Sequence, residues 1–357
     1  MQNISNFYKG KKVLVTGATG FKGSWLCAWL LKLGAKVYGL GFYPNENRKL
    51  FYSLSLDQKI KLKLFDIRDI TKLKKFINKS KPSIIFHLAA QSLVLNSYKE
   101  PFLTFDVNTR GTLNILECSR KYKFVKSIIL VTSDKCYKNV GKIKRYKEDD
   151  YLGGTDPYSA SKASTEILIK SYRENFFNKK INQGISSARA GNVIGGGDWA
   201  SNRLIPDCIK FIKKNTSIKL RNPKSNRPWQ FILESLSGYL ILGKKQFLNP
   251  KKYSSEWNFG PDVKSIATVK DIVNQVIKFW GKGSIKILKK QKLKEQINLQ
   301  LDIKKAKNIL KWRPTYNLKT SLYLTLDWYY KVLKNKSNPL YITNKQIEMY
   351  MKKSKLK

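Results

Sequence analysis

Residues 12–23 read Lys-Val-Leu-Val-Thr-Gly-Ala-Thr-Gly-Phe-Lys-Gly. The apolar run 12–16 predicts a buried strand, and residues 23–33 predict a helix that ends at Gly34. Glycines 17, 20 and 23 fall between the two. Such a turn lets backbone N–H groups approach a phosphate and places a helix N-terminus against it. An ordinary glycine-rich turn is the alternative, but the strand-to-helix setting favours a dinucleotide site.

The first half of the chain continues the same alternation of apolar runs and amphipathic segments. We expect strands at 36–42, 61–65, 83–88 and 127–132, and helices at 71–79, 102–122 and 159–178. Strands buried on both faces and separated by helices form a parallel, doubly wound sheet. The predicted fold class is therefore α/β, with a Rossmann-type sheet.

The chain is expected to divide into two domains and a tail. Residues 1–190 form the Rossmann domain, and 191–335 form mainly a smaller substrate-binding lobe. Part of 230–265 is expected to return to the first domain. The Lys-rich residues 336–357 show little periodicity and predict a loosely attached tail.

Composition excludes several classes of protein. The net charge is +46, but only 11 of the 70 basic residues are Arg and the lysines are scattered. Nucleic-acid surfaces cluster their charge and favour Arg, so we expect neither a nucleic-acid nor a membrane partner. A catalytically silent protein that uses this charge to bind RNA or membrane is the alternative from another class.

The numbers and positions of the cysteines and histidines exclude further kinds of site. The four cysteines lie far apart without a CxxC pair, so we expect no metal, no disulfide and a cytoplasmic location. No stretch reaches the roughly 18 apolar residues of a membrane span. His87 is the only histidine, which excludes Ser-His-Asp triads and histidine metal sites.

Two further signals concern the site. Tyr158 and Lys162 stand four apart on one face of a predicted helix. A cation beside a phenol lowers the pKa of the phenol, so Tyr158 could act as a base on a substrate hydroxyl. Residues 39–42 end the second strand without a carboxylate, which leaves NAD and NADP both open. Asp66 could bind the adenine amino group or cap a helix.

Thr16–Gly23, Leu88-Ala89-Ala90-Gln91 and Tyr158-xxx-Lys162 together resemble the extended short-chain dehydrogenase/reductase family, over nearly all of residues 10–335. The resemblance implies a nicotinamide enzyme that uses NAD and acts on a nucleotide sugar. The implied cofactor-binding residues are Gly17, Thr19, Gly20, Phe21, Lys22, Gly23, Asp66, Ile67, Leu88, Ala89, Ala90, Tyr158 and Lys162.

The residues after the fifth strand indicate the type of reaction. In that family a Ser or Thr follows this strand, and sugar-nucleotide 4,6-dehydratases place an acid and a base next. Ser133, Asp134 and Lys135 match these positions. Most dehydratases have Asp-Glu there, and Asp-Lys resembles the branch that acts on CDP-glucose. Segments 20–26, 188–199 and 227–230 resemble the same branch. Another nucleotide-sugar epimerase, or a GDP-, UDP- or dTDP-sugar dehydratase, is the alternative.

The resemblance also implies roles for individual residues. Tyr158 would remove the proton of the sugar 4-hydroxyl, Lys135 would remove the C5 proton, and Asp134 would protonate the departing 6-hydroxyl. The last two roles need neutral forms, which burial favours and their proximity opposes. The implied catalytic residues are Ser133, Asp134, Lys135, Tyr158 and Lys162, and the substrate-binding residues are Gln91, Asn192, Arg203 and Arg227.

The same residues also have purely structural explanations. Ser133-Asp134-Lys135 could be a strand-end turn with a solvated ion pair, and Arg203 and Arg227 could form surface ion pairs. Trp25 and Trp29, four apart, predict packing rather than cofactor stacking. The family resemblance further implies a homodimer or higher homo-oligomer, paired through helices 102–122 and 159–178.

Overall fold

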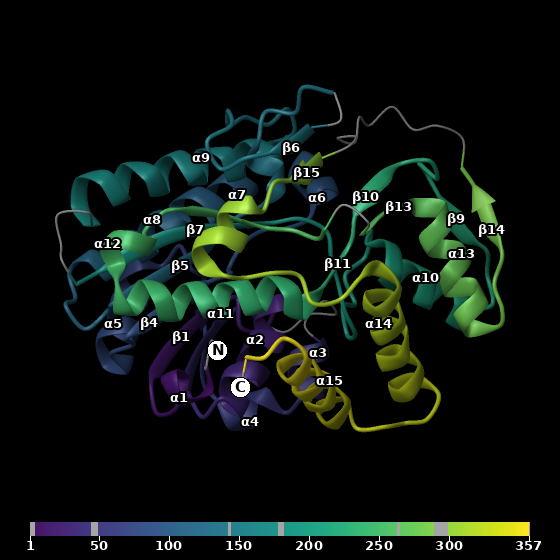
Figure 1. Ribbon diagram of the computed structural model, residues 1–357, viewed down its shortest axis with the longest axis horizontal. Helices are drawn as coiled ribbons and strands as arrows, with labels where there is room; N and C mark the ends of the chain where they lie inside the picture. Colours follow the sequence, from purple (N-terminus) through teal and green to yellow (C-terminus); the bar gives the residue numbers. More distant parts are fainter. Residues whose placement is uncertain are drawn as a thin grey trace.

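A computed structural model describes residues 4–43, 49–141, 144–177, 182–262, 265–288 and 299–356. Its centre is a seven-stranded sheet in which neighbouring strands run parallel (Figure 1). The strands in spatial order are β12 (Glu256–Phe259), β7 (Gly184–Ala190), β5 (Ser127–Val131), β4 (Ile84–His87), β1 (Lys12–Thr16), β2 (Lys36–Gly41) and β3 (Lys61–Leu64). The order reverses direction at β1, as in doubly wound sheets, so the predicted α/β fold is confirmed.

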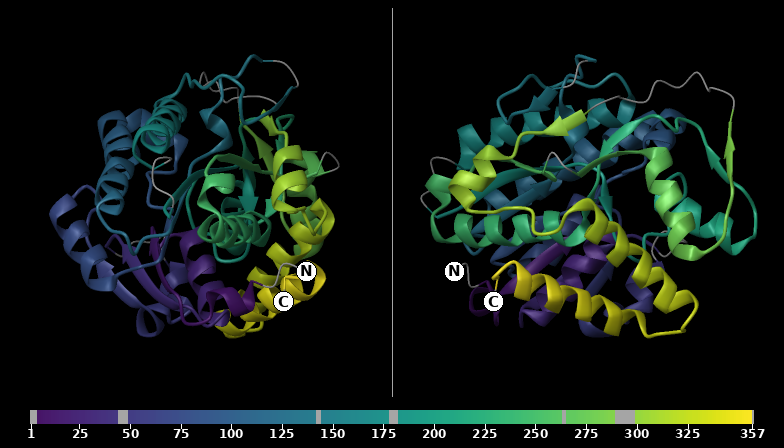
Figure 2. Two further views of the ribbon diagram at one scale, coloured as in Figure 1. Left: turned by 60° about the vertical axis from the view of Figure 1, so that its left-hand side comes forward. Right: turned by 45° about the vertical axis from the view of Figure 1, so that its right-hand side comes forward.

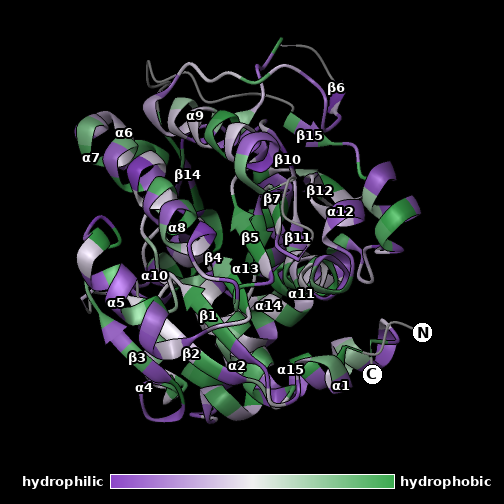
Figure 3. Cartoon of the chain, turned by 90° about the vertical axis from the view of Figure 1, so that its left-hand side faces the viewer, coloured by the Kyte–Doolittle hydropathy of each residue, from purple (hydrophilic) through white to green (hydrophobic). Residues whose placement is uncertain are grey.

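Helices cover both faces of this sheet. α2 (Phe21–Lys32) and α11 (Ile232–Leu248) pack on one face, and α5 (Ile70–Ser80), α8 (Gly111–Arg120) and α9 (Pro157–Tyr172) pack on the other. Figure 3 shows the apolar central strands between these two layers. Successive strand residues point to opposite layers, so the sheet divides the interior into two hydrophobic cores.

Two predicted helices differ in detail. The expected helix 102–122 consists of α7 (Pro101–Phe105), the π-helical turn η2 (Asp106–Arg110) and α8. The expected helix 159–178 begins earlier, at Pro157, because Asp156 caps it by accepting a hydrogen bond from Ser159 N at 2.9 Å. It continues into the π-helical turn η4 (Arg173–Phe177), and Asn178 lies outside the described residues.

The second half of the chain builds short sheets beside the carboxyl edge of the large one. Within it, α11 and β12 belong to the large sheet and its covering layer, whereas α10, α13, β9 and β14 gather at the right-hand end of Figure 1. The division into domains at residue 190 stays a prediction. The elements beyond β7, apart from α11 and β12, are β8 (Val193–Ile194), α10 (Leu204–Lys213), β9 (Ile218–Leu220), β10 (Asn226–Pro228), β11 (Gln230–Phe231), α12 (Pro250–Tyr253), β13 (Ile266–Thr268), α13 (Val269–Trp280), β14 (Ile285–Ile287), β15 (Leu299–Leu301), η6 (Ala306–Leu310) and α14 (Leu318–Leu333). Shorter elements of the first half are α1 (Ser5–Tyr8), α3 (Lys49–Ser53), α4 (Leu56–Lys59), α6 (Val94–Lys99), η3 (Asp134–Cys136) and β6 (Lys144–Tyr146).

The expectation of a loosely attached C-terminal tail is wrong. Residues 339–353 form helix α15 (Pro339–Lys353), which packs along α2 (Figure 2). Its buried side chains Ile342, Ile347 and Tyr350 recur at helical spacing. The ring of Tyr350 meets that of Trp29 edge to face, with centroids 5.7 Å apart. The many lysines of this segment hid an amphipathic pattern whose apolar face belongs to the core.

His87 ties together three elements next to the site. It ends β4, and its ring nitrogens lie 2.7 Å from the Thr16 hydroxyl of β1 and 3.1 Å from the Thr112 hydroxyl of α8. Burial, followed by the positive charge of Lys162, lowers the pKa of His87 to about 3. The imidazole is therefore neutral in the folded protein at all but strongly acidic pH.

We predict that His87 contributes to acid destabilisation. Its pKa is 6.5 when unperturbed and about 3 here, so unfolding takes up a proton between these values and stability falls as pH falls. Each pH unit inside this window costs about 1.4 kcal/mol. Urea unfolding measured at about pH 7 and at about pH 5 should show that the free energy of unfolding falls more between these pH values for the natural chain than for His87→Gln. Equal losses would contradict the prediction.

Candidate active site

The turn after β1 is built for close approach of the backbone. Gly17 has a φ of +70°, and a Cβ there would lie 2.7 Å from Ala89 N. A Cβ on Gly23 would overlap the carbonyl of Gly17. Gly20 caps α2 without any side-chain hydrogen bond, so no cap side chain bonds the first N–H groups of the helix. This turn fits the pyrophosphate of a dinucleotide.

Asp66 follows β3 at the same edge of the sheet. Its carboxylate is held by Arg68, with Nε to Oδ1 at 3.0 Å and Nη2 to Oδ2 at 2.7 Å. The Arg68 hydrogen bonds lower the pKa of Asp66. Helix α5 is capped instead by Asp69, which accepts from Lys72 N at 2.9 Å. The helix-cap alternative for Asp66 is therefore wrong, whereas contacts of Asp66 and Ile67 with adenine stay a prediction.

The loop after β4 is fastened to α9 by a residue that the motifs do not indicate. Asn108, in the π-helical turn η2, accepts from Gln91 N at 2.9 Å and donates to Gln91 O at 3.1 Å and Ser161 Oγ at 2.9 Å. The Gln91 amide itself bonds Leu93 and Thr104. Gln91 thus shapes this loop, and a contact of Gln91 with substrate stays a prediction.

Tyr158 and Lys162 lie on the buried side of α9. Tyr158 is only 7% exposed, and burial raises the pKa of its phenol to about 12, although a hydrogen bond with Ser133 and the charge of Arg203 lower it. The expected lowering of this pKa by Lys162 is thus not the outcome, because desolvation outweighs the favourable groups. Burial likewise lowers the pKa of Lys162 to about 8, while Glu166 opposes the change.

Ser133 joins the tyrosine to the dehydratase-like pair. Its hydroxyl donates to Asp134 Oδ1 at 3.0 Å and accepts from Lys135 N at 3.2 Å. Asp134 is 6% exposed, and burial raises the pKa of its carboxyl against the opposing charges of Lys135 and Arg227. The solvated-ion-pair alternative is therefore wrong for Asp134, because its carboxyl is buried. The structure brings Ser133, Asp134 and Tyr158 into one cluster.

Cations surround this cluster. Burial and the charge of Arg203 lower the pKa of Lys22 to about 8. The charge of Lys22 in turn lowers the pKa of Asp134. Arg203 Nε lies 3.7 Å from Asp198 Oδ2, so the ion-pair alternative for Arg203 is present in this structure. Asn192 lies between β7 and β8, where its carbonyl accepts from Gln230 N at 3.0 Å. Binding of pyrophosphate by Asn192, Arg203 and Arg227 stays a prediction.

A buried carboxylate, that of Glu166, bonds residues next to the cluster. Glu166 lies one turn after Lys162 on α9 and forms an ion pair of 2.8 Å with Arg189 of β7, with both side chains at most 4% exposed. It also accepts hydrogen bonds from Thr132, next to Ser133, and from Ser187. The i+4 spacing from Lys162 and a charged residue inside a buried strand were the available signals for this pair.

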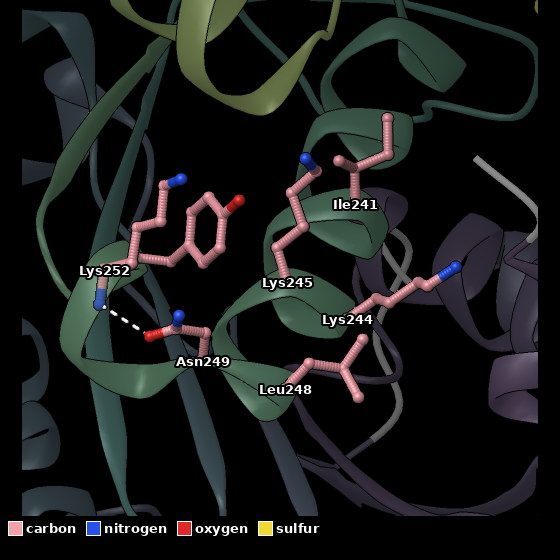
Figure 4. A pocket seen from close by; sticks show the side chains of 7 residues that line it. Ile241, Lys244, Lys245, Leu248, Asn249 and Lys252 are labelled. Atoms are coloured by element: carbon pink, nitrogen blue, oxygen red, sulfur yellow. Dashed lines mark hydrogen bonds between the residues drawn. The ribbon is translucent and has the colours of Figure 1, made fainter. Parts of the chain in front are cut away.

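Other features lie apart from the cluster. A surface hollow is formed by α11 and α12 around Lys245, Lys252 and Tyr253, and no candidate catalytic residue lines it (Figure 4). Trp25 and Trp29 are fully buried, which confirms packing. Among the described residues there is no group of His, Cys, Asp and Glu suited to a metal ion, and no helix able to cross a membrane. The four cysteines are free and buried.

Comparison with known proteins places the chain in a family. The model of the GDP-mannose 4,6-dehydratase family matches residues 14–325. The chain belongs to this family. A CDP-glucose 4,6-dehydratase from Salmonella typhimurium is 39% identical to the chain over 351 residues, which cover 97% of this chain and 98% of that relative. The resemblance to nucleotide-sugar dehydratases is thereby confirmed.

Solved structures agree on the fold of the family. A dTDP-glucose 4,6-dehydratase from Streptomyces venezuelae, with NAD bound, has a TM-score of 0.78 and 22% identity, and covers 92% of this chain and 99% of that one. The dTDP-glucose 4,6-dehydratase from Bacillus anthracis, in complex with NAD, has a TM-score of 0.77 and 23% identity, and covers 93% and 100%. The family fold therefore extends over nearly the whole chain.

We predict that Glu166→Gln destabilises the protein by roughly 3 kcal/mol, because Arg189 would remain buried without its counter-charge. The substitution should also lower the pKa of Lys162 further, since Glu166 raises it. Urea unfolding tests the first effect and the pH profile of activity tests the second. Glu348→Gln is the control, because its ion pair with Lys32 is exposed and should be worth at most about 1 kcal/mol. Equal losses in the two variants would contradict the prediction.

Proposed function

We propose that the protein is an NAD-dependent CDP-glucose 4,6-dehydratase, a hydro-lyase that forms CDP-4-keto-6-deoxyglucose. The observation that carries this proposal is the buried Asp134, whose raised pKa favours a proton donor, hydrogen-bonded to the same Ser133 that bonds Tyr158. An epimerase has no need of an acid at this place. The 39% identity with the Salmonella enzyme over almost the full length supports the choice of CDP-glucose.

The glycine turn and the predicted contacts at Thr19, Phe21, Leu88 and Ala90 would hold NAD. When bound, NAD+ would supply the hydride acceptor for C4 and the hydride that returns to C6, so no net redox equivalent is consumed. The first N–H groups of α2, which no cap side chain bonds, suit the pyrophosphate. Lys22 adds positive charge beside the turn.

In the first half of the reaction Tyr158 would take the proton of the 4-hydroxyl. Ser133 would assist by turning its hydroxyl proton from Asp134 to the phenol oxygen, and Arg203 by its charge, since both lower the pKa of the phenol. Lys162 lies one turn away on the same face of α9 and is buried with it. Loss of this proton together with the C4 hydride leaves a 4-ketone.

In the second half the ketone acidifies the C5 proton. Lys135 would remove this proton as a free amine, and Asp134 would donate its proton to the 6-hydroxyl, so that the C6–O bond breaks and water leaves. The C5=C6 double bond then takes a hydride at C6 and a proton at C5. Proton donation fits the raised pKa of Asp134.

Assembly and location complete the proposal. The family resemblance favours a homodimer through α7, α8 and α9, and the exposed side chains Phe102, Phe105 and Ile167 on these elements support it. Phe102 is 82% exposed in the single chain, which is a high exposure for a large apolar side chain. A cytoplasmic location stays a prediction.

The decisive experiment is turnover with CDP-, dTDP-, GDP- and UDP-hexoses, each with NAD+ or NADP+. We expect a 4-keto-6-deoxy product, which absorbs near-ultraviolet light in alkali, with CDP-glucose and NAD+. The cofactor arm matters because Gly41 ends β2 without a carboxylate. An epimerised sugar, or preference for another nucleotide, would replace this proposal by one of its alternatives.

A second experiment separates the two half-reactions. Lys135→Met should leave oxidation at C4 intact, because Tyr158, Ser133 and Lys162 are untouched, while water loss should fall by about 100-fold or more. The oxidation is followed by the absorbance of reduced nicotinamide in a single turnover, and the elimination by the alkaline product. Full dehydration by this variant would remove Lys135 from the mechanism.

A further inference from the structure

The carboxyl of Asp134 occupies a space that exists only because residue 191 lacks a side chain. Gly191 follows the last residue of β7, and a Cβ built on it would lie 2.6 Å from Asp134 Oδ2 and 3.2 Å from Asp134 Cγ. Optimal van der Waals contact between carbon atoms lies at about 3.5–4.0 Å, so both distances are too short for an undisturbed contact. A side chain at 191 and the present position of the Asp134 carboxyl therefore exclude each other.

Gly191 differs in this respect from the other glycines. All 21 lie within the described residues, and Gly191 alone would meet the carboxyl of a candidate catalytic residue. Gly17 and Gly154, in contrast, would meet backbone atoms. A backbone clash requires the chain to shift, whereas a clash with the end of a side chain can be relieved by rotation of that side chain. A methyl group at 191 should thus displace the Asp134 carboxyl and leave the backbone fold unchanged.

The oxygen nearest to Gly191 is the one that would carry the acidic proton. Asp134 Oδ1 accepts the Ser133 hydroxyl at 3.0 Å, so the proton of the neutral acid falls on Oδ2. A general acid must lie within about 2.6–3.2 Å of the atom it protonates. A displacement of about 0.5 Å is enough to weaken such a site.

We propose that Gly191 is a positioning residue for dehydration, which holds the proton-bearing oxygen of Asp134 in place by leaving room for it. The inference rests on the proposed function, and it assigns to Gly191 an effect on water loss rather than on oxidation at C4 or on substrate binding. Tyr158 and Lys162 lie on α9 and stay where they are when the Asp134 carboxyl moves.

The test is Gly191→Ala, assayed with CDP-glucose and NAD+ in deuterated water. We expect single-turnover oxidation at C4 and the KM for CDP-glucose to change less than about 3-fold. Dehydration should slow by about 10- to 100-fold, because a displaced acid loses part of the roughly 10²- to 10⁴-fold that a general acid contributes. Exchange of the C5 proton with solvent should continue, because its base, Lys135, is not displaced. Oxidation and dehydration that fall together would overturn the proposal, as would unchanged dehydration.

Two further variants sharpen the result. Gly260→Ala is the matched control, because Gly260 follows β12 directly beside Gly191 in the sheet, and its Cβ would meet only the side chains of Leu301 and Ile303, at 3.3 Å or more. It should dehydrate normally. Asp134→Asn removes the acid, so adding Gly191→Ala to it should cause no further loss of dehydration. A further loss of 10-fold would show that Gly191 acts through another group and overturn the proposal.

A failure of the proposed function is distinguishable from these outcomes. In that case the natural chain itself forms no 4-keto-6-deoxy sugar from CDP-glucose. The inference about Gly191 fails alone when the natural chain dehydrates CDP-glucose and Gly191→Ala does so equally well.

Discussion

The site depends on one buried ion pair, Glu166 with Arg189. Glu166 belongs to the helix that carries Tyr158 and Lys162, whereas Arg189 belongs to the strand that ends before Gly191. Burying such a pair costs desolvation free energy, which additional hydrogen bonds to the charged groups partly offset. Here Thr132 and Ser187 supply additional hydrogen bonds to Glu166. The pair therefore fixes the helix, β5 and β7 relative to one another at the point where the candidate catalytic groups emerge.

The same network continues to the edge of the sheet. Arg189 Nη1 lies 2.6 Å from the Tyr137 hydroxyl, which donates to Asn258 of β12 at 2.8 Å. Asn258 in turn donates to the carbonyls of Tyr146 and Asp302. Residues from five separate segments thus share one polar network. Among the described residues Arg189 Nε lacks a hydrogen-bond partner, so part of the cost of burying this charge is not offset, and the bonds of Arg189 Nη1 and Nη2 connect the segments.

Local patterns in the sequence predict the frame of the fold well, because they record short-range physics. The turn at 17–23, the apolar runs and the Tyr158–Lys162 spacing each depend on neighbours within a few residues. They locate the sheet, the predicted cofactor turn and the helix that carries the candidate catalytic residues. The handedness of parallel connections restricts the strand orders that are possible, and the structure shows which one is adopted. Asp134 could be singled out only through resemblance to a family, since a single acidic residue after a strand has no distinctive local pattern.

What the sequence analysis missed depends on contacts between distant segments. Asn108, in a π-helical turn, bonds both the loop after β4 and Ser161 of α9, which lies 53 residues further along the chain. The C-terminal helix looked like a charged tail, because the lysines of residues 336–357 mask an apolar stripe that α2 and α14 cover. The raised pKa of Tyr158 likewise depends on total burial, which the spacing of two residues does not reveal.

The charges of the site explain how substrate binding and acid catalysis can cooperate. Lys135, Arg227 and Lys22 each lower the pKa of Asp134, and burial alone raises it. In the proposed complex the pyrophosphate of the substrate brings negative charge among these cations. This charge offsets the cations that favour the carboxylate, so it moves the pKa of Asp134 upward, towards the protonated form that dehydration requires. A truncated substrate without the pyrophosphate would lose this effect. Binding at the nucleotide end of the substrate would thus raise the rate of water loss at C6.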